Sequence, residues 1–238
     1  MLHPVENVEA LFRVTGREPE LWSADSGDRR ATSWHVRQGR TVMPLRLDSY
    51  DSVFVVFRKP TDRGAHVVPM SREMPVMFID GDWEVTFERD RGAPCEAQRM
   101  GLDSWTNNPA PGIKYFSGVA TYRITFALER RSSPPGARWI LDLGEVHELA
   151  EVFLNGHCVG TAWHPAFRLD VTDALRAGTN ALEVHVANLW VNRLIGDQQP
   201  GTTDPVAFVV TSTYSHDAPL RPSGLLGPVR LLMDARQE

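Results

Sequence analysis

Three segments of this chain alternate apolar and polar residues, and that period of two restricts the fold more than any other feature. The alternation runs through residues 83–87, 122–128 and 182–187. Successive side chains of a β-strand point to opposite faces, so each segment predicts a strand with one buried and one solvated face. No stretch alternates such strands with amphipathic helices, as a barrel of parallel strands requires. The chain is therefore predicted to be all-β.

Turn signals divide the remainder of the second half into further strands. Residues 139–143, 150–154 and 224–232 predict strands. Asn155-Gly156 follows one of these runs and predicts a tight hairpin, because a type I′ turn needs positive φ at both central residues. Residues 173–177 predict one short helical turn. Strands at this spacing are typical of an antiparallel jelly-roll sandwich.

The first seventy residues predict a separate, smaller β unit. Roughly a four-stranded meander is expected, with strands at 8–14, 34–36, 41–47 and 52–57. The charged, proline-bracketed residues 58–75 predict a linker, with the boundary near Ser71. The expected domains are a small β-sandwich over 1–70 and a jelly-roll over 71–238. A unit of the smaller size covers its apolar faces poorly, so we expect it to pack on another domain or to self-associate.

Composition excludes several classes of function. The formal net charge of -5 and the isoelectric point near 5.9 leave no basic stripe for nucleic acid. The chain has neither an apolar run long enough to cross a bilayer nor a signal-peptide pattern, which predicts a soluble chain without membrane contact. Its compartment stays open, and a longer parent would be secreted or periplasmic. Cys95 and Cys158 do not match the spacing of a zinc site, and a single bridge between them stays open.

Residues 90–117 predict a long loop inside the second domain. Glycine and proline interrupt it repeatedly, and it carries Trp105, Tyr115 and Phe116, which we expect to be exposed. Loops of this length inside a compact domain tend to be functional or to cover something.

Several motifs resemble known carbohydrate-active proteins. Four segments resemble, in order, the galactose-binding-like jelly-roll of family 2 glycoside hydrolases: 117–123, 141–146, 150–156 and 178–184. Residues 188–197 (NLWVNRLIGD) are similar to the C-terminal jelly-roll of family 106 α-L-rhamnosidases, and segments within 12–22 and 52–59 are similar to the small β unit after their catalytic barrel. The resemblance covers nearly the whole chain. It implies the C-terminal part of a glycoside hydrolase whose catalytic barrel lies outside this sequence.

The resemblance implies a non-catalytic role in carbohydrate binding or in domain organisation. Glycoside hydrolysis normally needs two carboxylates that face each other across a sugar. The acidic pairs Glu145 with Glu148 and Glu148 with Glu151 lie in a short connection and on a predicted strand face, so no catalytic residue is assigned. Whether the chain alone is an enzyme stays open. Two alternatives remain, a freestanding carbohydrate-binding module and a structural module without ligand.

The candidate site residues lie in loops at the ends of the predicted sandwich. A pyranose stacks an apolar face on Trp or Tyr while its hydroxyls bond to Asn, Asp, Arg or His. The candidates for binding a rhamnose- or galactose-containing glycan are Trp105, Tyr115, Trp163, His164, Trp190, Asn192 and Arg193. The candidates for docking against a catalytic barrel are Arg193, Asp197 and His216. Core packing is the alternative for Trp163 and Phe167, and capping of the core is the alternative for Trp190.

A structural calcium ion is the remaining cofactor question. Jelly-roll domains of this class often hold calcium with loop carboxylates. Asp80, Asp82 and Glu84 offer acids at alternate positions, although two of them flank the entry to a strand, where acids mostly face solvent. No cofactor is assigned with certainty.

Overall fold

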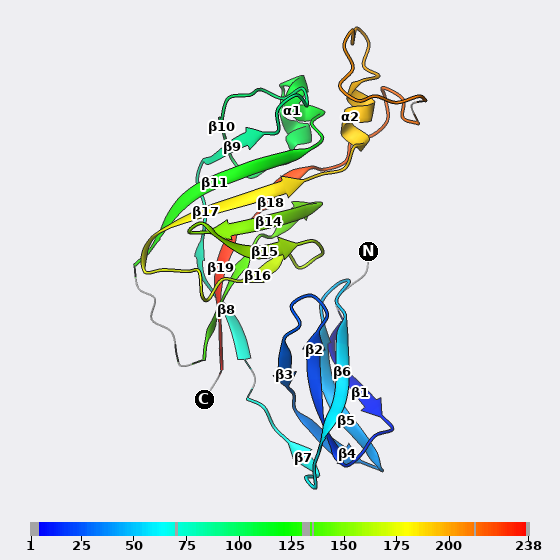
Figure 1. Cartoon of the computed structure of the whole chain (residues 1–238), viewed down its shortest axis with the longest axis vertical. Coiled ribbons are helices and arrows are strands. Elements are labelled where there is room, and N and C mark those ends of the chain that lie inside the picture. Colours follow the sequence, from blue (N-terminus) through cyan, green and yellow to red (C-terminus); the bar gives the residue numbers. More distant parts are fainter. Residues whose placement is uncertain (1–4, 70, 130–133, 135, 212, 237–238) are drawn as a thin grey trace. The chain divides into compact units, whose positions relative to one another are not determined.

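The computed structural model describes residues 5–69, 71–129, 134, 136–211 and 213–236. The chain forms two compact units (Figure 1). Unit 1 comprises Met1–Ser71 with Arg236–Glu238, and unit 2 comprises Arg72–Ala235. The regular secondary structure of the described residues is almost entirely strand in both units, which confirms the all-β prediction.

Within the part of unit 1 that the structure describes, the strands form two antiparallel sheets. One sheet has the order β1-β5-β4-β7, with bounds Val5–Phe12, Arg40–Leu47, Trp34–Arg37 and Ala65–His66. The other has the order β3-β2-β6, with bounds Arg29–Ala31, Arg17–Ser23 and Val53–Pro60. Phe12 of the first sheet contacts Phe57 of the second, with 5.4 Å between ring centroids. The largest buried side chains of the unit include Trp34 and Met43.

Two details of unit 1 differ from the sequence prediction. The predicted four-stranded meander did not include β2 and β3. The sequence of β2 (REPELWS) carries charged residues where an alternating strand would carry apolar ones. Those charges pair across the sheet: the Lys59 ammonium lies 3.0 Å from the Glu18 carboxylate. The predicted linker 58–75 was too long, since β6 continues to Pro60 and strand β8 begins at Ser71.

The described residues of unit 2 form two large antiparallel sheets and one small one. The six-stranded sheet has the order β10-β9-β11-β17-β14-β15, with bounds Gln98–Met100, Trp83–Phe87, Val119–Leu128, Gly178–Ala187, Leu149–Leu154 and His157–Ala162. The four-stranded sheet has the order β16-β12-β19-β8, with bounds Arg168–Asp170, Arg138–Asp142, Arg230–Arg236 and Ser71–Phe78. The small sheet pairs β13 (Glu145–His147) with β18 (Gly224–Gly227).

The three alternating segments supply the buried face of the six-stranded sheet. Trp83 of β9, Tyr122 of β11 and Val184 of β17 are buried, and they pack in one cluster with Leu141 of β12 and Leu231 of β19. The core therefore lies between the two large sheets, as the period of two predicts.

The Asn155-Gly156 hairpin is confirmed. It joins β14 to β15, with Leu154 opposite His157, and both turn residues have positive φ, 54° and 81°. The Asn155 amide also donates to the backbone oxygen of Ala174 at 2.8 Å. The turn is thus fixed both by its backbone conformation and by its side chain.

The predicted loop 90–117 is more structured than expected. It contains β10, a 3-10 helix η1 (Trp105–Asn107) and helix α1 (Pro111–Lys114). The expected exposure of Trp105 and Phe116 was wrong, because both rings are fully buried and pack edge to face with a centroid distance of 5.4 Å. Helix α2 (Val191–Gly196) was not predicted.

Candidate functional site

Helix α2 and the loops after it project from one end of the sheets of unit 2 (Figure 1). We call residues 188–211 and 213–223 the α2 region. Its described residues include four of the predicted candidates, Trp190, Asn192, Arg193 and Asp197, together with His216. The sequence placed these residues near one another because they are close along the chain. The structure shows how each side chain is used.

Asn192 is buried and bonds only inside the unit among the described residues. Its amide nitrogen donates to the backbone oxygen of Arg221 at 2.7 Å and to Ser223 Oγ at 2.9 Å, and its amide oxygen accepts from the backbone nitrogen of Arg221 at 2.8 Å. The side chain therefore fastens α2 to the segment that leads into β18. Its donors and acceptor are occupied without a sugar.

Arg193 and Asp197 form a nearly buried ion pair one helical turn apart. The guanidinium Nη2 lies 2.9 Å from Asp197 Oδ1. The same carboxylate accepts the backbone N–H groups of Val206 at 3.1 Å and Ala207 at 2.8 Å. The predicted docking residues thus bond to each other and to the loop after α2. They tie that loop to the helix.

Tyr115 supports α2 from the side. A Cβ placed on Gly196 would lie 2.5 Å from Tyr115 Cβ and 2.6 Å from Arg193 Nη2, so no side chain fits between them. The Tyr115 ring is half-buried in this contact, and the Lys114 ammonium lies 5.7 Å from its centroid. Close packing of α1 against α2 accounts for the glycine.

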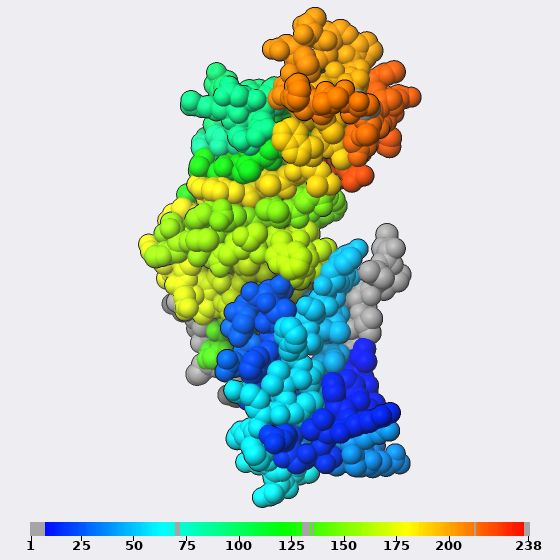
Figure 2. Space-filling model, turned by 45° about the vertical axis from the view of Figure 1, so that its right-hand side comes forward, coloured from blue at the N-terminus to red at the C-terminus, as the bar shows by residue number. Residues whose placement is uncertain are grey.

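The loop held by Asp197 carries apolar side chains into solvent. Phe208 is 95% exposed and Val210 is 92% exposed. Trp190, at the N-terminus of α2, is 48% exposed, and the guanidinium of Arg91 lies 5.0 Å from its ring centroid. Figure 2 shows the residues near 200–220, in orange, projecting from the surface of unit 2. Phe208 and Val210 were not among the predicted site residues, although the run VAFVV outside any strand pattern was a usable signal.

The other aromatic candidates divide into one exposed and one buried ring. Trp163 is 60% exposed, and the His164 ring stands edge-on to it with 4.7 Å between centroids. Trp105 is fully buried, and its Nε1 donates to the Tyr122 hydroxyl at 2.5 Å. Burial raises the pKa of Tyr122 to about 12. Trp105 presents no face to a ligand, whereas Trp163 does.

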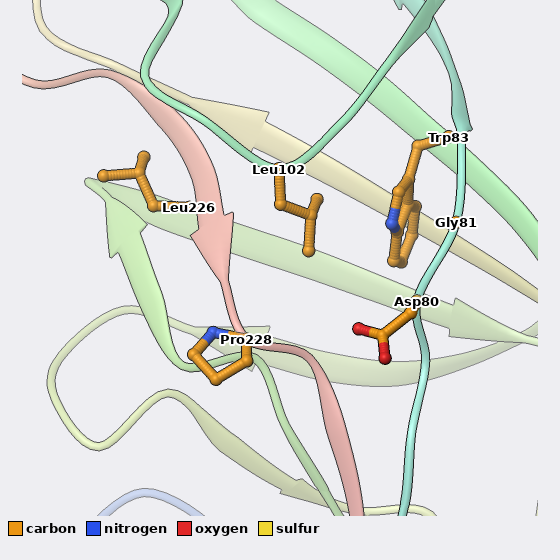
Figure 3. A pocket seen from close by; sticks show the side chains of 6 residues that line it. All are labelled: Asp80, Gly81, Trp83, Leu102, Leu226 and Pro228. Carbon is orange, nitrogen blue, oxygen red and sulfur yellow. The ribbon is translucent and has the colours of Figure 1, made fainter.

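A hollow of about 360 Å³ opens at the entry to β9 (Figure 3). The carboxylate of Asp80 and the edge of Trp83 line it together with apolar groups of Leu102, Leu226 and Pro228. The buried indole N–H of Trp83 donates no hydrogen bond within the described part of the chain. The hollow therefore combines one acceptor, the Asp80 carboxylate, with apolar walls, while the Trp83 N–H stays buried behind them.

Comparison with known proteins identifies the architecture. Residues 114–221 match the model of the glycosyl hydrolase 2 galactose-binding domain-like family. Unit 2 carries a galactose-binding-like domain of glycoside hydrolases. The predicted galactose-binding-like β-sandwich is thereby confirmed.

Two relatives cover larger parts of the chain. The structure of a rhamnosidase from Novosphingobium sp. PP1Y is 48% identical to this chain, with a TM-score of 0.90. The match covers 95% of this chain and 21% of the rhamnosidase chain. A protein of Formosa agariphila named "Putative beta-glucuronidase" is 37% identical over 180 residues, which are 66% of this chain and 15% of that protein. The predicted resemblance to rhamnosidases is confirmed, and the chain spans about a fifth or less of the length of these relatives.

The outer face of the galactose-binding-like domain carries a charged ladder that was not among the predicted sites. His185 Nε2 lies 2.6 Å from Glu183, and its Nδ1 lies 3.5 Å from Glu151. Arg123 Nε donates to the other oxygen of Glu183 at 2.6 Å. Partial burial raises the pKa of Glu183, but the bonds from His185 and Arg123 outweigh it and hold that pKa below its usual value.

The remaining candidates lie apart from this ladder. His216 is exposed, and its backbone oxygen accepts from Gln199 Nε2 at 2.7 Å. Cys95 and Cys158 are both exposed free thiols. Within the described ranges no group of three or more His, Cys, Asp or Glu could hold a metal ion, and no described helix is long and apolar enough to cross a membrane.

Proposed function

We propose that this chain is the non-catalytic, domain-organising C-terminal part of a glycoside hydrolase of the α-L-rhamnosidase type. The similarity to the Novosphingobium rhamnosidase carries the proposal, because 48% identity extends over 95% of this chain but over only 21% of the rhamnosidase. A region of this kind supports chemistry that takes place elsewhere in the enzyme. The small β-sandwich over 1–70 and the jelly-roll over 71–238 are its two proposed domains.

The α2 region supports a role in organising domains. Its polar candidates Asn192, Arg193 and Asp197 bond within the unit, while apolar side chains point outward. This arrangement suits contact with another protein surface better than contact with a sugar, whose hydroxyls need accessible polar partners.

A chimeric enzyme tests the proposal. The segment of the Novosphingobium rhamnosidase that matches this chain is replaced by these 238 residues. The chimera is expected to hydrolyse an aryl α-L-rhamnoside, and the isolated chain is expected not to. Hydrolysis by the isolated chain, lost on Glu145→Gln or Glu151→Gln, would overturn the non-catalytic role. A chimera that is inactive although it is folded would overturn the organising role.

Carbohydrate binding is a second candidate function, favoured by two separate features. The Trp163 ring is exposed beside His164, and the hollow at Asp80 offers a carboxylate acceptor and apolar walls. Sugars combine hydroxyls with an apolar face, so either place suits a pyranose of a rhamnose- or galactose-containing glycan.

Thermal shift of the isolated chain with such oligosaccharides separates the two places. Binding at the exposed ring predicts a shift that Trp163→Ala abolishes and Asp80→Asn retains. Binding in the hollow predicts the reverse. Trp190→Ala is the matched control, since it removes a similarly exposed indole in the α2 region. If no glycan changes the melting temperature, carbohydrate binding is rejected and only the structural role remains.

A further inference from the structure

The strongest unexplained feature of unit 2 is an apolar loop that the structure holds out into solvent. Residues 206–210 (VAFVV) follow α2, and Phe208 and Val210 keep more than nine tenths of their surface exposed. Apolar side chains scattered singly on a surface are ordinary, but neighbouring exposed ones on a single loop mark an interaction site. We call residues 206–210 together with Trp190 the apolar projection.

The base of the apolar projection is built to be rigid. The Asp197 carboxylate receives the backbone N–H groups of Val206 and Ala207, and Arg193 neutralises its charge from inside the unit. A Cβ on Gly92 would lie 3.2 Å from both Val206 Cγ2 and Arg193 Nη1, so the chain packs closely around the same point. A loop ordered before binding loses little conformational entropy when it docks.

The surroundings of the apolar projection indicate the chemistry of its partner. The Arg91 guanidinium lies over Trp190, and the Lys114 ammonium lies over Tyr115, which packs against Gly196 of α2. Tryptophan and arginine are the side chains most enriched at the energetic centres of protein interfaces. Arg91 also pairs with Glu88 at 3.2 Å, whereas the Lys114 cation fits acidic groups at the edge of an apolar pocket.

We propose that the apolar projection docks into an apolar, acid-edged pocket on the catalytic portion of a glycoside hydrolase, an inference that rests on the proposed function. The matched part of the related rhamnosidase is 21% of its chain, so about four fifths of that polypeptide is available to cover such a surface. Docking surfaces between domains of one chain are commonly of moderate size and partly polar. Phe208, Val210 and Trp190 supply the anchors.

Photo-crosslinking in the rhamnosidase chimera tests where the projection lies. Phe208 is replaced by p-benzoylphenylalanine, and the crosslinked peptides are identified by mass spectrometry. Crosslinks to peptides outside the 238 transplanted residues are expected. Crosslinks confined to those residues, or joining two copies of the chimera at the projection, would overturn the proposal.

A paired substitution measures the contribution of the contact. The double variant Phe208→Ser/Val210→Ser is expected to lower the melting temperature of the chimera by about 2–4 °C. In the isolated chain the same change is expected to have almost no effect, because both side chains are solvated there. Val67→Ser, at another strongly exposed apolar position, is the matched control and is expected to leave both proteins unchanged.

The outcomes separate this inference from the proposed function. If the wild-type chimera is active and melts in one transition while the double variant melts identically, the docking surface is wrong and the organising role stands. If the wild-type chimera itself fails to fold or to hydrolyse its substrate, the organising role falls, and the docking proposal falls with it.

Discussion

The sheets of unit 2 and its α2 region are stabilised in opposite ways. Between the sheets, apolar side chains such as Trp83 and Leu141 lie inside, and charged ones such as Arg123 lie on the outer face. In the α2 region, Asn192 and the Arg193–Asp197 pair lie inside, and Phe208 is outside. The first arrangement is what a self-sufficient domain needs. The second leaves apolar side chains in solvent, which is the feature on which the proposed docking rests.

Truncation of a core tryptophan should give the largest loss of stability, because the sheets of unit 2 depend on their apolar interior. Trp83→Ala is expected to lower the free energy of unfolding by about 3–5 kcal/mol, because it leaves a cavity in the cluster. Urea denaturation followed by circular dichroism measures it. Trp163→Ala removes an indole that is 60% exposed and is expected to cost about 0.5 kcal/mol or less. Equal losses of unfolding free energy in Trp83→Ala and Trp163→Ala would show that the buried and the exposed indole do not differ in their contribution to stability.

Breaking the buried Arg193–Asp197 ion pair tests how far the α2 region depends on its polar interior. Asp197→Ala leaves the Arg193 guanidinium buried without its partner and frees two backbone N–H groups, so a loss of about 3 kcal/mol is expected. The double variant Arg193→Met/Asp197→Leu should recover part of that loss, since it removes the unpaired charge. A double variant as unstable as the sum of the single ones would show that the pair does not act as a unit.

Alkaline pH should destabilise the core through Tyr122. Burial raises its folded pKa to about 12, above the ordinary value of 10.0, so the stabilisation is complete below pH 10 and is lost as pH rises toward 12. The loss attributable to this group is about 2–3 kcal/mol. This loss is measured as the difference between the wild type and Tyr122→Phe in how the free energy of unfolding changes with pH. Parallel profiles from about pH 9 to 12 would contradict it.

The hairpin turn gives a smaller, local test. Gly156→Ala places a Cβ at φ 81°, so a loss of about 1 kcal/mol is expected from backbone strain. Gly101→Ala is a useful control, because that glycine has open space around it and no positive φ. A loss as large at Gly101 as at Gly156 would argue against turn conformation as the cause.

The sheets of unit 2 were easier to predict from the sequence than the segments that pack at their ends. The strands β9, β11 and β17 were predictable because their burial alternates with the backbone itself, and Asn155-Gly156 was predictable because few other residues accept its dihedral angles. The burial of Trp105 was not, since it depends on Tyr122 and Ser223, which bind it from distant parts of the chain.

The candidate residues show the same limit. Residue type singled out Asn192 and Arg193 as sugar-binding candidates and Arg193 and Asp197 as docking candidates, but it did not give their partners inside the unit. Those partners, Arg221, Val206 and Ala207, are fixed by how the loop after α2 folds back. Phe208 was passed over because the run VAFVV signals an apolar loop but has no period that shows which of its side chains are exposed.

The sequence by itself determined that the chain is all-β, where several strands and the hairpin lie, and which glycoside hydrolases it resembles, because these depend on local period, on turn dihedrals and on motif order. Only the tertiary structure decided which polar groups are satisfied inside and which apolar groups are left outside. That decision depends on hydrogen bonds and packing between residues far apart in the chain, and no local pattern encodes them.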